Sequence, residues 1–402
     1  RCCSLRLRLR ATMVVVAEAR SMRVAIQGSG VAAAACARRL RATHDVTVFE
    51  SGRGPGGRMS TRRSDGYQWD HGAQYFSPKT DVFSVAVSEW VEQGWCDAWA
   101  GEHCVWSSEG GVSPDPKAAA AVRYVGTPGM NAICRGLLDG VEARYETRAV
   151  AMRRGGGGGA DRGWVLEHAK SGSALGEYDF LICTDKTAAA QHRKDLDREL
   201  LDDFVQPASA VPSVPSLALM VAVEQTRCGF DSLLLEGHPT FSWLARDSSK
   251  PGRRQGGGVE CWVAHASPDC AKRLLKSSRR RGGGGPRGVR EEVARGALYT
   301  SHEGPSSERL YSTFPQAVVR ELVPPLQRLL SELSDAVGAA PPEVLVAEGH
   351  RWGAAFPASS FAAAGSGEGR FYLDERNAFA ACGDYFSPFP GRVEGAWISG
   401  TL

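Results

Sequence analysis

Two glycines near the start of the chain have the spacing of a loop that binds a dinucleotide, in the segment Gly28-Ser29-Gly30-Val31-Ala32-Ala33. Glycines here let the backbone turn tightly and approach a pyrophosphate, whose charge would be met by backbone amides and by the positive end of a following helix. Ala33 stands where a third glycine is usual, and alanine suits a position that only needs close helix packing. The segment therefore predicts that Gly28, Ser29, Gly30, Val31 and Ala32 bind a dinucleotide.

An acidic residue, Glu50, follows about 20 residues further on, at the end of the next apolar run. Its carboxylate can accept hydrogen bonds from both hydroxyls of an adenosine ribose. A second glycine-rich loop with two arginines, residues 53–58, comes directly after it and precedes the segment 70–76. An arginine in such a loop can pair with the same pyrophosphate through two parallel hydrogen bonds. A plain NAD dehydrogenase has no need of this loop, so the pattern favours a resident flavin.

The elements that must position these residues form a strand–helix–strand unit. Residues 22–27 and 46–50 are short β-branched runs, and the alanine-rich stretch 31–43 between them suits a helix. Near the other end, an apolar run at 379–382 leads into Gly383-Asp384, and residues 393–402 predict a helix that is cut off after about two turns. The predicted fold class is α/β, with a Rossmann-like domain assembled from both ends of the chain and an inserted mixed α+β substrate lobe.

The predicted division of the chain has six parts. Residues 1–21 form a leader, residues 22–78, 123–185 and 345–402 form the cofactor-binding domain, and residues 79–122 and 186–344 form the substrate lobe. Glycine runs at 155–159, 256–258 and 282–285 cannot pack a core, so they are predicted to be surface loops. The arginine-rich leader is typical of a chloroplast or mitochondrial targeting peptide, and the alternative is a disordered tail.

These segments resemble the renalase-like branch of the FAD-dependent amine oxidase superfamily. The blocks that carry the resemblance follow the family order from residue 22 onward and cover nearly all of the chain outside the leader and the glycine runs. They are the two glycine loops, Glu50 and the segments 70–76, 125–130, 243–253, 262–267, 350–352 and 382–400.

The resemblance implies that FAD is bound without a covalent bond. Besides the residues of the first loop and Glu50, it assigns Arg53, Gly57 and Arg58 to the phosphates, Gly72, Ala73, Gln74 and Tyr75 to the isoalloxazine, Val150 to the adenine side, and Gly383 and Asp384 to the ribitol. Val393, Glu394 and Ala396 would bring a helix start to the flavin N1/O2 edge, where its partial positive charge stabilises the anion formed on reduction. Covalent attachment would need a cysteine or histidine beside the ring, and Cys382 is more typical of a buried strand residue.

The activity implied by the resemblance is oxidation of a small reduced nitrogen compound, either an amine or an aberrant dihydronicotinamide. Hydride would pass to flavin N5, and O2 would be the final acceptor, giving hydrogen peroxide. His265 is the candidate catalytic residue, with a histidine hydrogen-bonded inside the sheet as the alternative. Lys250 and Arg253 could attract a phosphate-bearing substrate or form a solvent-facing turn. Trp262 and Trp352 could form an aromatic wall against a flat substrate, or pack in the core.

The composition excludes several other functions. A net charge of +3 over 402 residues is too near balance for a nucleic-acid partner, and no apolar run reaches the roughly 18 residues of a transmembrane helix. Eleven cysteines without a Cys-x-x-Cys pair indicate reduced thiols in a soluble intracellular protein without a metal site.

Two rival functions remain. A flavin-dependent desaturase or isomerase acting on a lipid-like polyene would want a long apolar tunnel and a membrane-docking segment, neither of which the sequence shows. A catalytically silent FAD-binding protein is the other, because a short final helix would leave one flavin edge uncovered.

Overall fold

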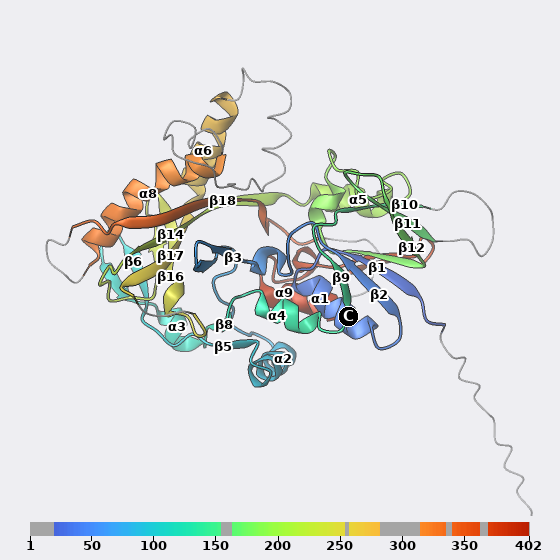
Figure 1. Cartoon of the computed structure of the whole chain (residues 1–402), viewed down its shortest axis with the longest axis horizontal. Coiled ribbons are helices and arrows are strands. Elements are labelled where there is room, and N and C mark those ends of the chain that lie inside the picture. Colours follow the sequence, from blue (N-terminus) through green and yellow to red (C-terminus); the bar gives the residue numbers. More distant parts are fainter. Residues whose placement is uncertain are drawn as a thin grey trace, which may run out of the picture.

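The computed structural model describes residues 20–153, 163–253, 257–281, 314–334, 340–361 and 369–401. Most of the predicted leader and the glycine runs at 155–159 and 282–285 lie outside these described residues. Within the described ranges, no helix combines the length and the apolar character that crossing a lipid bilayer requires. Two large sheets lie toward opposite ends of the molecule, with the helices α1 and α9 close together between them (Figure 1).

The first sheet has six strands in the order β19-β20-β13-β1-β2-β9, and only β19 runs antiparallel to its neighbour. Its strands are β1 (Arg23–Gln27), β2 (Asp45–Phe49), β9 (Glu142–Arg144), β13 (Phe180–Cys183), β19 (Tyr372–Asp374) and β20 (Phe379–Ala381). The helix α1 (Val31–Leu40) connects β1 and β2, which confirms the predicted strand–helix–strand unit. The helix ends three residues earlier than predicted, because the chain turns there to enter β2.

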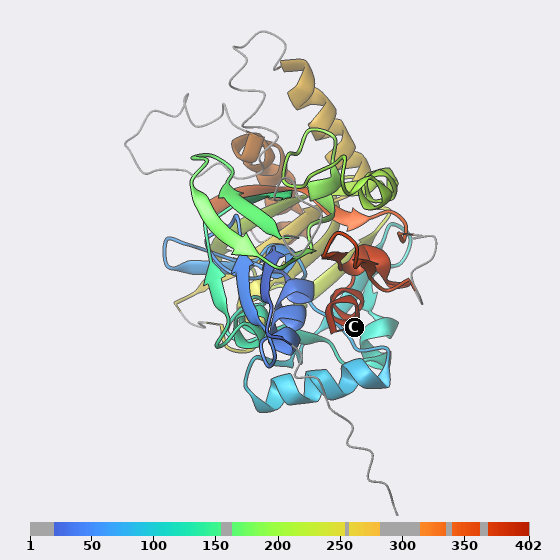
Figure 2. The ribbon, with the colours of Figure 1, turned by 90° about the vertical axis from the view of Figure 1, so that its right-hand side faces the viewer.

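Segments from both ends of the chain meet in this part of the molecule. β20 pairs with β13, which in turn pairs with β1. The final helix α9 (Val393–Thr401) packs along α1, where a Cβ atom at Gly400 would collide with the backbone of Ala32. Figure 2 shows the two helices side by side, with α2 (Asp81–Glu92) crossing near their ends. The Rossmann-like α/β fold that the sequence predicts is therefore present.

The second sheet has seven strands in the order β18-β14-β17-β16-β15-β6-β7, and only the β15–β6 pair is parallel. Its strands are β6 (His103–Ser107), β7 (Gly111–Pro114), β14 (Ser213–Glu224), β15 (Ser232–Glu236), β16 (Phe241–Arg246), β17 (Val259–Ala266) and β18 (Val344–Pro357).

The two faces of the seven-stranded sheet differ in what covers them. Alternation along β14 turns Leu219 and Val221 toward α6 (Pro268–Arg281) and α8 (Phe314–Glu332), where they join an apolar core. The opposite face packs against the hairpin formed by β3 (Thr61–Ser64) and β4 (Tyr67–Asp70). Trp69 of the hairpin is fully buried there, and its indole N–H donates to the Val221 carbonyl at 2.9 Å.

Two of the predicted boundaries do not match the sheets. β18 (Val344–Pro357) pairs with β14 along most of its length, so a boundary at residue 345 assigns a strand of the second sheet to the cofactor-binding part. Within 79–122, β6 and β7 join the second sheet, whereas α2 packs through Phe83 and Trp90 on the core around β1 and α1. Strand pairing is not encoded locally, which is why sequence patterns missed both points. We propose that the last cofactor-binding segment begins after Pro357.

The remaining elements are short. They comprise the strand pair β5 (Cys96–Ala98) and β8 (Tyr124–Gly126), the antiparallel sheet β10 (Ala149–Arg153), β11 (Trp164–His168) and β12 (Ala174–Tyr178), the helices α3 (Pro116–Ala120), α4 (Ala132–Leu137) and α5 (Asp202–Ala210), and the 3-10 turns η1 (Gly57–Met59), η2 (Lys186–Ala189), η3 (Asp247–Ser249) and η6 (Asp384–Phe386).

Candidate functional site

The first glycine loop lies at the carboxyl end of β1. Gly28 has a φ of +101°, and a Cβ atom there would lie 2.5 Å from the Thr184 hydroxyl, so only glycine fits. Gly30 is the N-cap of α1, and a Cβ atom on it would meet nothing nearer than 3.9 Å. The backbone at Gly30 is therefore not crowded beside the first turn of α1, whose leading amides have no partner within the helix. This arrangement can hold an anion such as a pyrophosphate.

The second glycine loop packs directly on the first. The Gly56 amide donates to the Ser29 carbonyl at 3.0 Å, and a Cβ atom at Gly57 would lie 3.4 Å from the Gly30 Cα. Both Gly56 and Gly57 have positive φ angles, of 133° and 53°. Arg53 is exposed on the same loop. The two loops thus form one continuous surface beside α1, as the sequence predicts for groups that share a ligand.

Glu50 lies at the junction of the two loops. One carboxylate oxygen accepts from the Ser29 amide at 3.0 Å and from the Ser29 hydroxyl at 2.6 Å. The other accepts from the Gly52 amide at 2.6 Å and from the Ser51 hydroxyl at 3.3 Å. Because a carboxylate has about four acceptor positions, a ribose hydroxyl at Glu50 would replace one of the serine hydroxyls.

Arg58 and Asp384 form a bidentate ion pair between the two ends of the chain. Both guanidinium–carboxylate hydrogen bonds measure 2.7 Å, and Arg58 also donates to the Ala355 carbonyl at 3.2 Å. Asp384 additionally accepts from the Gly391 amide at 2.9 Å. The Asp384 side chain is 4% exposed and that of Arg58 is 41% exposed, so the guanidinium still faces solvent on one side. Sequence reasoning assigned the two residues separate roles and did not anticipate the pair.

The segment 72–75 runs between the second glycine loop and the seven-stranded sheet. A Cβ atom at Gly72 would collide with the Arg58 carbonyl, and the Ala73 amide donates to that same carbonyl at 2.9 Å. The Tyr75 ring lies 4.3 Å from the Arg123 guanidinium and 5.6 Å from the Trp243 ring. The backbone of Arg58 therefore holds one end of the segment, and Arg123 and Trp243 contact its other end.

An aromatic cluster adjoins Gly72. His265 Nε2 lies 3.2 Å from the His71 carbonyl, and because a carbonyl only accepts, this nitrogen carries the proton. Trp352 donates to the same carbonyl at 3.0 Å and stacks on the His71 ring, with 5.0 Å between centroids. His350 meets both rings edge-on, at 4.6 Å from His71 and 4.5 Å from Trp352. The structure thus brings the predicted His265 and Trp352 together.

Sequence reasoning included His71 and His350 in segments that carry the resemblance but assigned a role to neither. His71 directly precedes Gly72, and His350 lies two residues before Trp352 on one strand, so alternation gives the two side chains the same face. Those two signals were available in the sequence.

The three histidines are neutral at neutral pH. Burial lowers the pKa of His265 to about 4, and the nearby Lys250 adds to this while the hydrogen bond to His71 opposes it. Burial and Arg62 lower the pKa of His350 to about 4, and burial holds the pKa of His71 well below its usual value. A histidine with so low a pKa is a poor proton acceptor near pH 7. The geometry therefore favours the alternative interpretation of His265, a histidine hydrogen-bonded within the protein.

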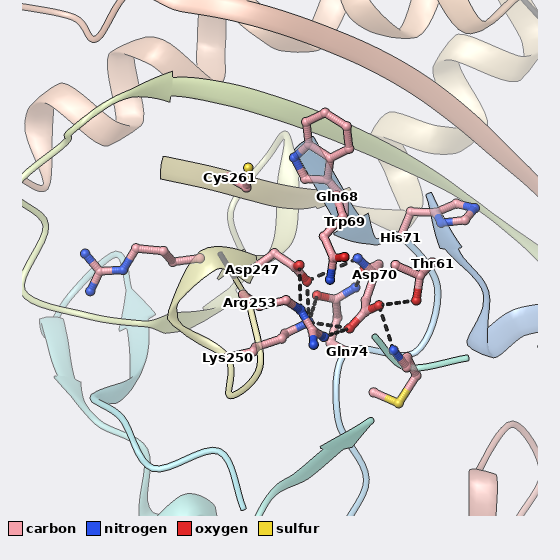
Figure 3. Close-up of polar contacts among 12 residues, drawn as sticks. Thr61, Gln68, Trp69, Asp70, His71, Gln74, Asp247, Lys250, Arg253 and Cys261 are labelled. Carbon is pink, nitrogen blue, oxygen red and sulfur yellow. Dashed lines mark hydrogen bonds and ion pairs between the residues drawn. The ribbon is translucent and has the colours of Figure 1, made fainter. Parts of the chain in front are cut away.

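Lys250 and Arg253 lie in a buried ionic cluster with Asp70 and Asp247 (Figure 3). Lys250 is 0% exposed and Arg253 is 7% exposed, so the interpretation as a solvent-facing turn is wrong for both side chains. Neither cation is available to a substrate phosphate while these ion pairs hold. The sequence did not reveal this cluster, because Asp70 lies far from Lys250 in the chain and only the fold brings the two together.

Trp262 lies away from the candidate site. Alternation along β17 turns it to the face opposite His265, where it is fully buried and donates to Glu260 at 2.9 Å. It packs in the core, which was the alternative interpretation. Val150 lies on β10, and Gln27 at the end of β1 donates to the neighbouring Ala149 carbonyl at 3.0 Å. This bond places β10 beside the first glycine loop.

The start of α9 is anchored through Glu394. Its buried carboxylate accepts from the amides of Lys79 and Thr80, at 3.0 and 2.8 Å, and from the Thr80 hydroxyl at 2.7 Å. The Glu394 side chain is thus committed to the N-terminus of α2, and only its backbone remains for a ligand. Val393 and Ala396 are buried in the same helix.

The turn before η6 is built around Gly383. Its φ is +151°, and its amide donates to the Ser399 hydroxyl at 2.8 Å, which ties the turn to α9. Cys382 is buried at the end of β20, and hydrogen bonding with Cys36 together with burial raises its thiol pKa well above the ordinary value. A thiolate is the nucleophile in covalent attachment, so this environment disfavours it.

A cavity of about 430 Å³ lies apart from the glycine loops. It is bordered by the β3–β4 hairpin, including Arg63 and Gln68, and by Asp247, Arg253 and Cys261. Among the residues that the structure describes, no group of three or more His, Cys, Asp or Glu side chains could hold a metal ion.

Comparison with known proteins agrees with this geometry. A family model for an NAD(P)-binding Rossmann-like domain matches residues 26–87, the part that contains both glycine loops. The chain is similar to a putrescine oxidase solved with bound putrescine, at 12% identity and a TM-score of 0.56, over 95% of this chain and 98% of that one. It is similar to a putative protoporphyrinogen oxidase from Exiguobacterium sp., at 11% identity and a TM-score of 0.59, over 95% and 97% of the two chains.

An oxidoreductase from Methanosarcina mazei is also similar, at 13% identity and a TM-score of 0.58, over 94% of this chain and 99% of that one. Each match spans nearly the full length of both chains. The protein therefore has the mixed α/β fold of these oxidoreductases, with a Rossmann-like dinucleotide-binding domain.

Proposed function

We propose that the protein is an oxidase that binds FAD without a covalent bond and oxidises a small reduced nitrogen compound, either an amine or an aberrant dihydronicotinamide. The observation that carries the proposal is the convergence of the two glycine loops, Glu50 and the Arg58–Asp384 pair at one place. These groups come from opposite ends of the chain, and together they suit the two phosphates, the ribose and the ribitol of one extended cofactor.

The residues present fit FAD better than a freely exchanging nicotinamide. The second glycine loop extends the phosphate-binding surface beyond the first, and the half-exposed Arg58 can add a charge-assisted bond to an incoming phosphate. The segment 72–75 lies next to this pair, where the flavin ring system would continue. The backbone at the start of α9 would supply a partial positive charge to one edge of that ring.

FAD would supply the acceptor for a hydride leaving the substrate carbon, and O2 would then take up two electrons and two protons to give hydrogen peroxide. The protein's own part is to exclude water and to orient a flat substrate. Trp352 and His350 offer rings beside Gly72, and the neutral His350 places no positive charge beside the substrate nitrogen. No base is required if the substrate nitrogen supplies its own lone pair.

The test uses the purified full-length chain. We expect a yellow protein, or a colourless one that takes up added FAD and releases it on denaturation. Under anaerobic conditions, simple amines and dihydronicotinamide isomers are added in separate experiments, with free FAD as the control. Bleaching by one class and recovery in air with one hydrogen peroxide per substrate support the proposal.

The same experiment separates the alternatives. Failure to bind FAD contradicts the cofactor assignment. Tight FAD binding with no bleaching by either class indicates a catalytically silent FAD-binding protein. A polyene is added in a further experiment, and its conversion without hydrogen peroxide indicates a desaturase or isomerase.

A further inference from the structure

The buried ionic cluster connects the β3–β4 hairpin to the loop that follows β16. Asp70 is the last residue of the β3–β4 hairpin, whereas Asp247, Lys250 and Arg253 come from the loop that follows β16. Lys250 Nζ lies 2.8 Å from Asp247 and 3.5 Å from Asp70, and Arg253 donates to Asp247 at 3.2 Å and to Asp70. All four side chains are at most 1% exposed. Figure 3 shows them converging from the two segments.

The cluster is balanced in charge and depends on that balance. Two carboxylates face two cations, so no net charge is buried. Burial alone would raise the pKa of Asp70, but Arg253 and Lys250 outweigh it, aided by bonds from the Met130 amide and the Thr61 hydroxyl, and hold that pKa below its usual value. Removing one member would leave an uncompensated buried charge, which is strongly unfavourable.

Lys250 is the member of the cluster whose charged group contacts the segment 72–75. Its ammonium lies 3.4 Å from Gln74 Oε1, whereas Nη1 of Arg253 donates to the carbonyls of Gly126 and Pro251. Gln74 Nε2 donates to the backbone carbonyls of Asp70 and Gly72, the latter at 3.1 Å. Because the amide nitrogen is committed to acceptors and its oxygen to a cation, the Gln74 side chain has one orientation. Its bonds to the carbonyls of Asp70 and Gly72 thus bridge the backbone on both sides of His71.

We propose that Lys250 is a positioning residue, which fixes the Gln74 amide and through it sets the backbone of residues 72–75 against the cofactor. The contact with the cofactor rests on the proposed function, but the placement of the segment does not. Through the contact between Lys250 and Gln74, the loop that follows β16 would set the backbone position of the segment 72–75.

Four variants separate positioning from charge balance. K250M removes the ammonium and leaves the cluster with one excess negative charge, so we expect it to melt at a lower temperature or to fail to fold. K250M/D247N restores the balance without restoring the contact with Gln74. Q74M removes that contact together with the Gln74 bonds to the Asp70 and Gly72 carbonyls, leaves all four charges in place, and so shows the largest effect that loss of the Gln74 amide can have. R246M is the matched control, because Arg246 is ion-paired to Asp231 and Glu260 and contacts neither Gln74 nor the segment.

The first measurement needs no cofactor. Amide hydrogen exchange in the peptide that covers residues 71–75 should become about tenfold faster in K250M/D247N and in Q74M, because loss of the contact favours local opening. Exchange in this peptide should stay at the wild-type rate in R246M, even if R246M is less stable overall. Wild-type exchange in K250M/D247N overturns the proposal, whatever Q74M shows, and leaves charge balance as the role of Lys250.

The second measurement uses the FAD-loaded protein. The visible spectrum and the reduction potential of bound FAD should change in the same two variants and not in R246M, whereas a purely structural role would change stability and leave both unaltered. If the wild-type protein does not bind FAD, the proposed function fails, and the exchange measurement still decides the role of Lys250.

Discussion

The Asp384 carboxylate is almost fully buried and relies on one guanidinium for its charge partner. In R58A, Asp384 keeps only the Gly391 amide, so we expect the free energy of unfolding to fall by about 1–2 kcal/mol, with the half-exposed position of Arg58 limiting the loss. We also expect the Kd for FAD to rise about tenfold, through loss of one charge-assisted bond to phosphate. Equilibrium dialysis and denaturant unfolding measure the two effects.

The exposed Arg39 on α1 supplies a matched control, and R39A should match the wild type in both assays. The double variant R58A/D384N should lose less stability than the sum of the single variants, because the two residues act as a pair. Wild-type retention of FAD by R58A after extensive dialysis contradicts the phosphate role.

At this scale, sequence reasoning succeeds where a residue's function depends on its neighbours in the chain. Gly28 was predictable because the tight turn between a strand and a helix imposes a positive φ that glycine adopts readily. The partners of Arg58 and Lys250 were not predictable, because Asp384 and Asp70 lie far away in the sequence and only the fold brings them close.

Among the elements, α9 depends on the buried contact between Glu394 and the start of α2. The carboxylate accepts three hydrogen bonds and adds negative charge where the N-terminus of α2 is partially positive. We expect E394A to lower the melting temperature by about 5 °C, and E394Q by less, because one acceptor oxygen remains.

Differential scanning calorimetry measures these shifts. E89A on the exposed face of α2 is the control and should melt within error of the wild type. A melting temperature for E394A equal to that of E89A would show that the contact does not stabilise α9.

Elements that depend on neighbouring residues were predictable from the sequence, and strand pairings between distant segments were not. The unit β1–α1–β2 follows from local apolar periodicity and was predictable to within three residues at each boundary. The pairing of β18 in the seven-stranded sheet was not predictable, because its partner β14 lies over a hundred residues earlier in the chain. Apolar alternation indicates a strand but not the strand with which it pairs.

For the molecule as a whole, the neutral histidine cluster makes stability depend on pH. The pKa of His265 and of His350 is about 4 in the folded protein, against about 6.5 in an unfolded chain. Below pH 6.5 these histidines bind protons in the unfolded state and stay neutral in the folded state. The stability that they contribute above pH 6.5 is therefore lost as the pH falls toward 4. The lowered pKa of Asp70 acts in the same direction at still lower pH.

We expect the free energy of unfolding to decrease by at least about 1 kcal/mol between pH 6.5 and 5.5. Urea titrations at several pH values measure the slope. H350Q should flatten it, whereas H192Q, which changes an exposed histidine, should leave it unaltered. Equal slopes in wild type and H350Q would mean that His350 does not contribute.

The meeting of β1, β13 and β20 in one sheet also has a consequence for biosynthesis. A ribosome makes β1 and α1 first, yet their neighbours β20 and α9 emerge only after more than three hundred further residues have been added. Until then the nascent chain exposes the apolar surface of α1 without its final covering. Binding of the proposed flavin would consequently be a late event, because β20 and α9 are missing while translation continues.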